Sequence, residues 1–197
     1  MDTSRGPDML KIAIILGSTR PHRNGEAVAK WAYDLARQRG DADYELIDLR
    51  EVNLPLLDEA IPPSQGKYQH EHTKAWSAKV ASFDGYVFVT PEYNHSTSAA
   101  LKNALDFVYA EWNNKAAGFV GYGSAGGTRA VEHLRGICAE LQVATVRQQV
   151  MLSLYTDFEN FSSFKPAAHH AQSFGTLLEQ LLAWAGALRT VRQGQAA

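Results

Sequence analysis

The alternation of short apolar runs with amphipathic segments constrains the fold of this 197-residue chain more than any other feature. Five runs rich in β-branched and other apolar residues occur at positions 10–16, 44–49, 85–90, 118–122 and 143–151. Nearly continuous apolar runs of this length are typical of strands covered on both faces of a parallel sheet. The sequence therefore predicts a buried sheet of five strands.

Apolar residues recur at helical spacing between these runs and after the last of them. The expected apolar helix faces consist of Ala27, Val28, Trp31 and Leu35; Trp76, Val80 and Phe83; Leu101, Leu105 and Val108; the stripe around Cys138; and Phe174, Leu177, Leu178, Leu181, Leu182, Ala185 and Leu188. Strands that alternate with helices through short links imply right-handed crossovers. We therefore predict an α/β fold.

The length favours one domain rather than two. We expect a flexible N-terminus over residues 1–9, a single domain over residues 10–189 and a loose tail over residues 190–197. Two stretches, 53–69 and 153–165, are too long for tight connections. In a compact domain such loops are more often binding elements or interfaces than idle connectors.

Composition excludes several classes of function. Hydrophobic residues make up 45% of the chain and the net charge is −2, which supports neither nucleic-acid binding nor electrostatic attachment to a membrane. The first seven residues lack the apolar core of a signal peptide. The one cysteine, Cys138, excludes a disulfide within the chain and is expected to be buried. These features fit a cytoplasmic protein.

The segment GSTRPHRNG at residues 17–25 follows the first strand and opens the first helix. Small residues there allow a tight turn that exposes backbone N–H groups at a positive helix terminus, and Arg20 and Arg23 add charge for a phosphate. The segment matches neither the P-loop nor the GxGxxG pattern. Asp48, at the end of the second strand, is therefore expected to be a surface or capping carboxylate and not a ribose ligand.

Two further unusual segments follow the third and fourth strands. Residues 90–96 (TPEYNHS) place a proline-fixed turn beside an aromatic ring and an amide, and residues 121–127 (GYGSAGG) allow close backbone approach to a ligand. Parallel sheets bind ligands at the carboxyl ends of their strands. One loop suited to phosphate and two suited to a planar ring predict FMN.

These segments resemble the NADPH-dependent FMN reductase family, which includes quinone, azo-compound and chromate reductases. The resemblance rests on GSTRPHRNG, PEYNHSTSAALKNALD and GYGSAGGTRA and extends from about residue 11 to 136. It implies a flavodoxin-like three-layer sandwich with a parallel sheet of strand order 2-1-3-4-5 and helices on both faces. It also implies FMN as cofactor, NADPH or NADH as electron donor, and a small-molecule acceptor.

The resemblance also implies site residues. Those expected to hold the FMN phosphate are Ser18, Arg20, Arg23, Asn24 and Gly25, and those expected around the ring or ribityl chain are Pro91, Glu92, Tyr93, Asn94, Gly123, Ser124, Gly126 and Gly127. Lys102, Asn103 and Asp106 match the motif but are expected to anchor their helix.

Members of the family commonly form dimers or tetramers. The resemblance therefore implies a homodimer or homotetramer in which loop 53–69 walls a neighbouring site. One departure is the run Ser96–Ala100, where many relatives carry proline or glycine. A freer turn at this position is expected to alter the mouth of the pocket.

Flavin chemistry requires no nucleophilic side chain, so we predict no catalytic residue and no metal. The pairs His70/His72 and His169/His170 lack the spacing of a zinc motif, and His95 is as well suited to a turn or cap as to substrate contact. Two alternatives stay open: a flavodoxin-type electron carrier, and a redox-sensing flavin protein without NAD(P)H turnover. A net charge of −2 is mild for a carrier, since such proteins tend to be strongly acidic.

Overall fold

The computed structural model describes residues 9–195. Most of the expected flexible N-terminus, residues 1–8, and the last two residues of the expected tail lie outside that range.

The five predicted strands form one parallel sheet. They are β1 (Lys11–Leu16), β2 (Asp43–Asp48), β3 (Gly85–Pro91), β4 (Lys115–Gly123) and β5 (Val143–Ser153), and their spatial order is β2-β1-β3-β4-β5. This confirms the predicted flavodoxin-like order. β2 lies on one side of β1 and β3 on the other. The connection from β1 to β2 and the connection from β3 to β4 therefore run in opposite directions along the sheet. Ligands in sheets of this kind bind at such a switch point.

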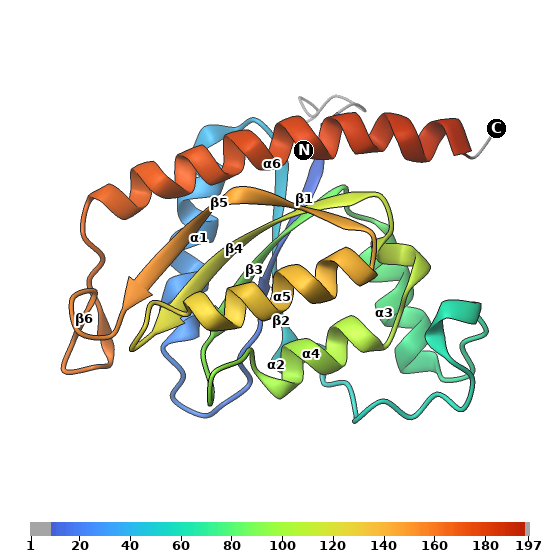
Figure 1. Ribbon diagram of the computed structural model, residues 1–197, viewed down its shortest axis with the longest axis horizontal. Coiled ribbons are helices and arrows are strands. Elements are labelled where there is room, and N and C mark those ends of the chain that lie inside the picture. Colours follow the sequence, from blue (N-terminus) through green and yellow to red (C-terminus); the bar gives the residue numbers. More distant parts are fainter. Residues whose placement is uncertain (1–8, 196–197) are drawn as a thin grey trace, which may run out of the picture.

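Helices cover both faces of the sheet (Figure 1). One face carries α1 (Gly25–Arg39) and the long α6 (His169–Gln195), and the other carries α3 (Glu71–Ala81), α4 (Ala99–Asp106) and α5 (Thr128–Glu140). The shorter elements are α2 (Leu49–Val52), the 3-10 turns η1 (Pro63–Gln65) and η2 (Ala110–Trp112), and the two-stranded hairpin β6 (Phe158–Glu159) and β7 (Ser163–Phe164). That hairpin lies within residues 153–165, where the sequence predicted only a long loop.

The alternation of side chains along each strand divides the core into two parts. In β1, Ile12 and Ile14 pack with α1 and α6, whereas Ala13 and Ile15 pack with α3 and α4. Both sets are fully buried, which explains why the strand reads as a continuous apolar run. Cys138 is fully buried on the second side, as predicted.

The C-terminal helix continues beyond the expected end of the domain. It extends to Gln195, and the Arg192 guanidinium contacts the Asp84 carboxylate and donates to the carbonyl of Asn114 at 2.6 Å. Residues 190–195 are therefore helix and not the expected loose tail. The Arg192–Asp84 ion pair holds the last turns of α6 against the start of β3. No helix in residues 9–195 combines the length and apolarity needed to cross a bilayer.

One cation is buried far from the carboxyl edge of the sheet. Lys115 begins β4 and is 3% exposed. Its ammonium donates to the carbonyls of Val80 (2.8 Å) and Ala81 (3.2 Å) and to the hydroxyl of Tyr86 (3.1 Å). Burial, reinforced by the charge of Arg192, lowers its pKa to about 7.

Candidate cofactor site

The first loop, residues 17–25, is held from beneath by a buried ion pair. The Arg23 side chain is 2% exposed and forms a two-pronged contact with the Asp48 carboxylate, one prong of which is Nη1–Oδ1 at 2.8 Å. Arg23 also donates to the carbonyl of Ser18. Asp48 in addition caps α2 by accepting from the backbone N–H of Arg50 at 2.9 Å, which agrees with its predicted role as a capping carboxylate.

Arg50 is a loop-holding residue that sequence reasoning missed. Its guanidinium donates to the carbonyls of Thr19 (3.3 Å) and Arg20 (2.6 Å). The Arg20 guanidinium lies 5.9 Å from the centre of the Tyr93 ring. Of the two arginines in this loop, Arg20 is exposed and Arg23 is buried.

The second loop is a tight turn. Tyr93 and Ser96 exchange backbone hydrogen bonds of 2.9 and 3.2 Å, and the two residues between them, Asn94 and His95, both have positive φ (47° and 77°). Positive φ at both central positions is characteristic of a type I′ turn, for which Asn is well suited. The turn joins the first loop directly, because the Tyr93 hydroxyl lies 2.8 Å from Ser18 Oγ.

Glu92 faces the third loop rather than open space. Its carboxylate forms an ion pair with Arg129 and accepts from the Arg129 backbone N–H at 3.2 Å, at the start of α5. An acidic side chain at this position also complements the positive end of the helix. Glu92 therefore joins the second and third loops.

The third loop requires its glycines. Gly126 and Gly127 both have left-handed backbones, with φ of 65° and 69°, and a Cβ on Gly127 would lie 2.6 Å from the backbone nitrogen of Tyr122. Gly127 caps α5, so this left-handed pair reverses the chain into the helix. The Gly123 carbonyl accepts from the N–H groups of Gly126 and Leu154, both at 3.1 Å.

The three loops enclose a cavity of about 160 Å³ at the carboxyl edge of the sheet. It is lined by Arg20, Arg23, Asn24, Pro91, Glu92, Tyr93, Tyr122, Gly123 and Leu154. Predicted residues outside this lining are Ser18, Gly25, Asn94, Ser124, Gly126 and Gly127, which shape the loops or lie at their tips. Sequence reasoning missed Tyr122 and Leu154, and the position of Tyr122 within GYGSAGG was the available signal.

Two residues that line this cavity each carry a buried polar atom that fits a phosphorylated ligand. Arg23 Nε and the Tyr122 hydroxyl have no hydrogen-bond partner within the described part of the chain. The nearest acid to Arg23 Nε is Glu26, whose Oε2 lies 3.7 Å away. Burial raises the pKa of Tyr122, so its hydroxyl stays protonated and can donate. An unmet buried donor is costly unless a ligand or water pairs with it.

A neighbouring glycine keeps this space open. A Cβ on Gly25 would fall 2.3 Å from the Tyr122 hydroxyl and 2.9 Å from Leu16 Cδ1. The helix that begins at Gly25 has no side-chain cap, and the Asn24 amide donates to the carbonyl of Phe161 at 2.7 Å. The N–H groups of the first turn of α1 are thus left for an anion.

The departure Ser96–Ala100 does not loosen the turn, contrary to our expectation. The Ser98 hydroxyl accepts from Leu101 N–H at 3.1 Å and donates to the carbonyl of Gly17 at 2.5 Å. Thr97 Oγ1 lies 2.8 Å from Thr90 Oγ1, and Ser96 Oγ lies 2.9 Å from His133 Nδ1. Hydroxyl groups take over the stiffening that proline would supply.

Replacing Ser98 with alanine is expected to lower the free energy of unfolding by about 2 kcal/mol, since it removes one helix cap and one hydrogen bond to the first loop. FMN affinity should fall as well, because the first and second loops lose a shared anchor. Urea unfolding and a flavin titration measure the two effects. The exposed Ser64 offers a matched control: Ser64→Ala should change stability by less than about 0.5 kcal/mol. Equal stability of the two variants would contradict the assigned role of Ser98.

The LKNALD motif has two functions. Lys102 and Asp106 form an ion pair of 2.6 Å within α4. Asn103 instead anchors the long loop 53–69: its amide donates to the carbonyl of Pro55 at 2.7 Å and accepts from Leu57 N–H at 3.0 Å. Asn103 therefore joins α4 to this loop and does not line the cofactor cavity.

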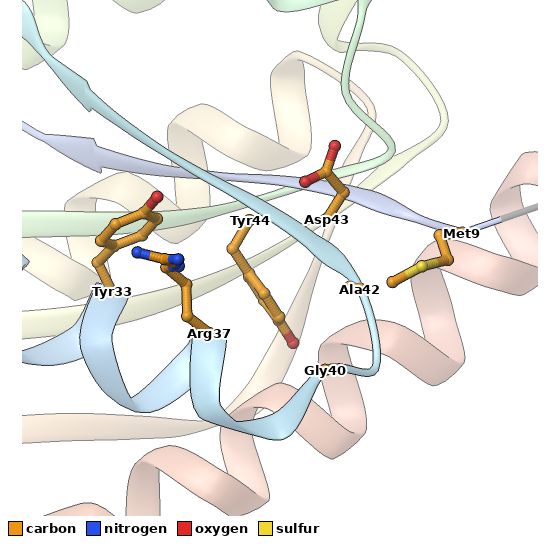
Figure 2. A pocket seen from close by; sticks show the side chains of 7 residues that line it. All are labelled: Met9, Tyr33, Arg37, Gly40, Ala42, Asp43 and Tyr44. Atoms are coloured by element: carbon orange, nitrogen blue, oxygen red, sulfur yellow. The ribbon is translucent and has the colours of Figure 1, made fainter. Parts of the chain in front are cut away.

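A second cavity, of about 420 Å³, lies at the opposite end of the sheet (Figure 2). Tyr33 and Arg37 of α1 face Tyr44 on β2, with the Arg37 guanidinium 5.4 Å from the centre of the Tyr33 ring. The Tyr44 hydroxyl donates to Asp41 at 2.7 Å. No motif of the sequence falls in this cavity. The cavity between the three loops is therefore the better candidate for the cofactor site, although it is the smaller of the two. Within residues 9–195, no group of three or more His, Cys, Asp or Glu side chains is arranged to hold a metal.

The fold and these three loops define a flavodoxin-like flavin-binding protein. The profile of the family described as NADPH-dependent FMN reductase matches residues 10–157, and the chain belongs to that family. The predicted class of enzyme, an FMN-dependent NAD(P)H oxidoreductase, is thereby confirmed.

Individual relatives agree with this assignment. An NAD(P)H-dependent FMN reductase of Schizosaccharomyces pombe is 37% identical over 169 residues, covering 85% of this chain and 84% of the relative. A 2-hydroxy-1,4-benzoquinone reductase of a Burkholderia species is 32% identical over 149 residues, covering 72% and 77%. The solved structure of FerB, a flavoenzyme NAD(P)H:(acceptor) oxidoreductase of Paracoccus denitrificans, has a TM-score of 0.69 at 19% identity and covers 89% of this chain and 97% of its own. At that identity the likeness supports the fold alone.

Proposed function

We propose that this enzyme oxidises NADPH or NADH and reduces small planar acceptors, quinones foremost. The balanced reaction converts NAD(P)H, one proton and a quinone into NAD(P)⁺ and a hydroquinone, with two electrons transferred. One observation carries the proposal. Arg23 and Tyr122 line the cavity where the three loops meet, and their Nε and hydroxyl groups have no hydrogen-bond partner in the described part of the chain. The benzoquinone reductase among the relatives supports the acceptor class.

FMN, when bound, supplies the hydride acceptor and donor, and the chain positions it. Asn24 and the first turn of α1, together with Arg20 and Arg23, would hold the phosphate. Pro91, Glu92, Tyr93 and Asn94 would border the ring, mainly through backbone groups, and the glycines of the third loop would admit it closely. A cavity of about 160 Å³ is smaller than the roughly 300 Å³ usual for an enclosed ligand, so part of the cofactor extends beyond it. That geometry leaves access for a donor and an acceptor in turn.

The proposal also includes where the enzyme acts and how it assembles. The enzyme acts in the cytoplasm and assembles as a homodimer or homotetramer, in which loop 53–69 borders a neighbouring site. The loop is held at Asn103 while Leu56 beside it is 82% exposed, so an apolar side chain is available for contact with another copy. Light scattering of the purified protein tests the assembly: a single-chain mass at micromolar concentration would refute it.

The visible spectrum of the protein tests the proposed reaction. With FMN added, a bound-flavin spectrum should appear; anaerobic NADPH should bleach it, and 2-methyl-1,4-naphthoquinone should restore it. If FMN binds but NADPH leaves it oxidised, the chain is an electron carrier or a redox sensor instead. If no flavin binds, the assignment of the cavity is wrong.

A further inference from the structure

The loop 153–165 carries the hairpin β6–β7, which lies near the carboxyl ends of β4 and β5 (Figure 1). Its base is fixed. The buried Asp157 accepts from the N–H groups of Ser153 (2.9 Å) and Ala167 (3.2 Å) and lies 2.9 Å from His170 Nε2. The Phe158 and Phe164 rings, 5.1 Å apart, pack against the core.

The hairpin tip and the turn that leads into the hairpin both expose an aromatic side chain. Tyr155 is 69% exposed and Phe161 is 59% exposed, and their rings meet edge to face with centres 5.7 Å apart. An edge-to-face pair stabilises by about 1 kcal/mol, which does not account for two aromatic rings left in water on a fixed base. Exposed apolar surface beside a cavity is characteristic of a binding site.

The backbone at the hairpin tip is left-handed at two consecutive residues. Asn160 and Phe161 have φ of 50° and 58°. A left-handed backbone is tolerated by Asn but costs a bulky residue such as Phe roughly 1–2 kcal/mol. Strain of this kind concentrates at functional sites, where the surrounding structure enforces it.

The hairpin is physically continuous with the cofactor cavity. The Phe161 carbonyl accepts from the Asn24 amide at 2.7 Å, and Leu154 lines the cavity while its N–H donates to Gly123. Asn24 and Gly123 are both predicted cofactor residues. The match to the family profile ends at residue 157, so it covers Tyr155 but not the hairpin tip that carries Phe161.

The charges of the hairpin indicate which ligand it suits. Its cation, Lys165, pairs with Glu159 at 2.6 Å, and its other acid, Asp157, is buried and fully bonded. A dinucleotide would need free cations for its phosphates. An uncharged planar ring needs only an aromatic partner.

We propose that Tyr155 and Phe161 form a platform that binds the ring of a planar, uncharged aromatic acceptor at the rim of the flavin site, and so set acceptor selectivity. This inference rests on the proposed reductase activity and adds a substrate contact to it. Each aromatic contact of this kind is worth about 0.5–1.5 kcal/mol, or roughly two- to tenfold in binding.

The test compares two acceptors in steady-state kinetics with saturating NADPH. In the double variant Tyr155→Ala/Phe161→Gly, kcat/KM for 2-methyl-1,4-naphthoquinone should fall about tenfold or more. For ferricyanide, which has no ring to stack, it should change less than twofold. The KM for NADPH and the dissociation constant of FMN should stay unchanged, because the Asn24 contact uses the backbone carbonyl at 161. Glycine also relieves the left-handed strain, so thermal stability should not drop.

A matched control removes a comparable exposed ring elsewhere. Trp184 on α6 is 48% exposed, and Trp184→Ala should leave both acceptors unaffected. The platform is refuted if the double variant keeps its naphthoquinone kcat/KM within twofold, if both acceptors decline equally, or if the KM for NADPH rises instead. Absence of turnover in the unaltered protein would refute the reductase activity itself, which is a separate result.

Discussion

Replacing Gly127 with alanine is expected to abolish detectable FMN binding and to lower the free energy of unfolding by about 3 kcal/mol or more. The residue has φ of 69°, where an alanine costs about 1–2 kcal/mol. The added Cβ would also lie 2.6 Å from the Tyr122 nitrogen and 2.7 Å from the Gly121 Cα. Both are backbone atoms of β4, so no change of rotamer relieves the clash.

The loss of FMN follows from the position of this clash. Moving Gly127 away from β4 shifts Gly123 and Tyr122, which line the cavity, and the start of α5, where Glu92 is held through Arg129. Two of the three loops are therefore displaced together. Flavin fluorescence quenching and urea unfolding measure the two effects.

Another glycine provides the control. Gly186 lies in the middle of α6, and a Cβ there meets only Leu10 Cδ1, at an ordinary 3.9 Å. Gly186→Ala should stabilise the protein by about 1 kcal/mol, because alanine is the better helix former. If Gly127→Ala binds FMN like the unaltered protein, the third loop does not shape the cofactor site.

The strands of the sheet were predictable because burial on both faces makes a strand a continuous apolar run in the sequence. In β1, the residues after Lys11 are buried on both sides of the sheet and are all apolar, so the run was visible in the sequence. The crossover rule then fixed the direction of the strands, and the family resemblance supplied their order. The hairpin β6–β7 escaped prediction because two-residue strands carry no periodicity and its aromatic residues divide between core and solvent.

The site was predictable in position but less so in detail. Glycine and proline identified the three loops, since their backbone geometry is encoded residue by residue. Arg23 illustrates what sequence could not give: its charge indicated phosphate, yet the fold buries it on Asp48, a residue 25 positions away. Which partner a charged side chain meets depends on tertiary distances. The cofactor role of each site residue accordingly stays a prediction.

The stability of the protein is expected to increase by roughly 2 kcal/mol between pH 7 and pH 9, because Lys115 is buried. Its pKa is about 7 in the fold, against 10.5 in a free chain. Between these values the unfolded chain binds the proton and the fold does not, so raising the pH favours the fold. Each pKa unit corresponds to about 1.4 kcal/mol, and the two-unit window includes the partly titrated region near pH 7.

Other buried groups limit this window from above. Burial raises the pKa of Cys138 to about 12 and that of Tyr86 well above 10. Both groups stay protonated in the fold while the unfolded chain loses their protons, so they reduce stability as the pH rises beyond 9. The contribution of Lys115 is therefore best measured from pH 7 to 9, by urea unfolding at constant ionic strength.

Lys115→Met isolates this contribution, because methionine fills a similar volume without a titrating group. The variant should show a free energy of unfolding that is nearly constant from pH 7 to 9, whereas Lys67→Met, which removes an exposed lysine, should keep the full increase. A flat profile in the unaltered protein would mean that the three oxygen atoms around the ammonium, from Val80, Ala81 and Tyr86, offset the cost of burying its charge. Because Lys115 begins β4 and the cofactor cavity lies at the end of that strand, FMN affinity should change in neither variant.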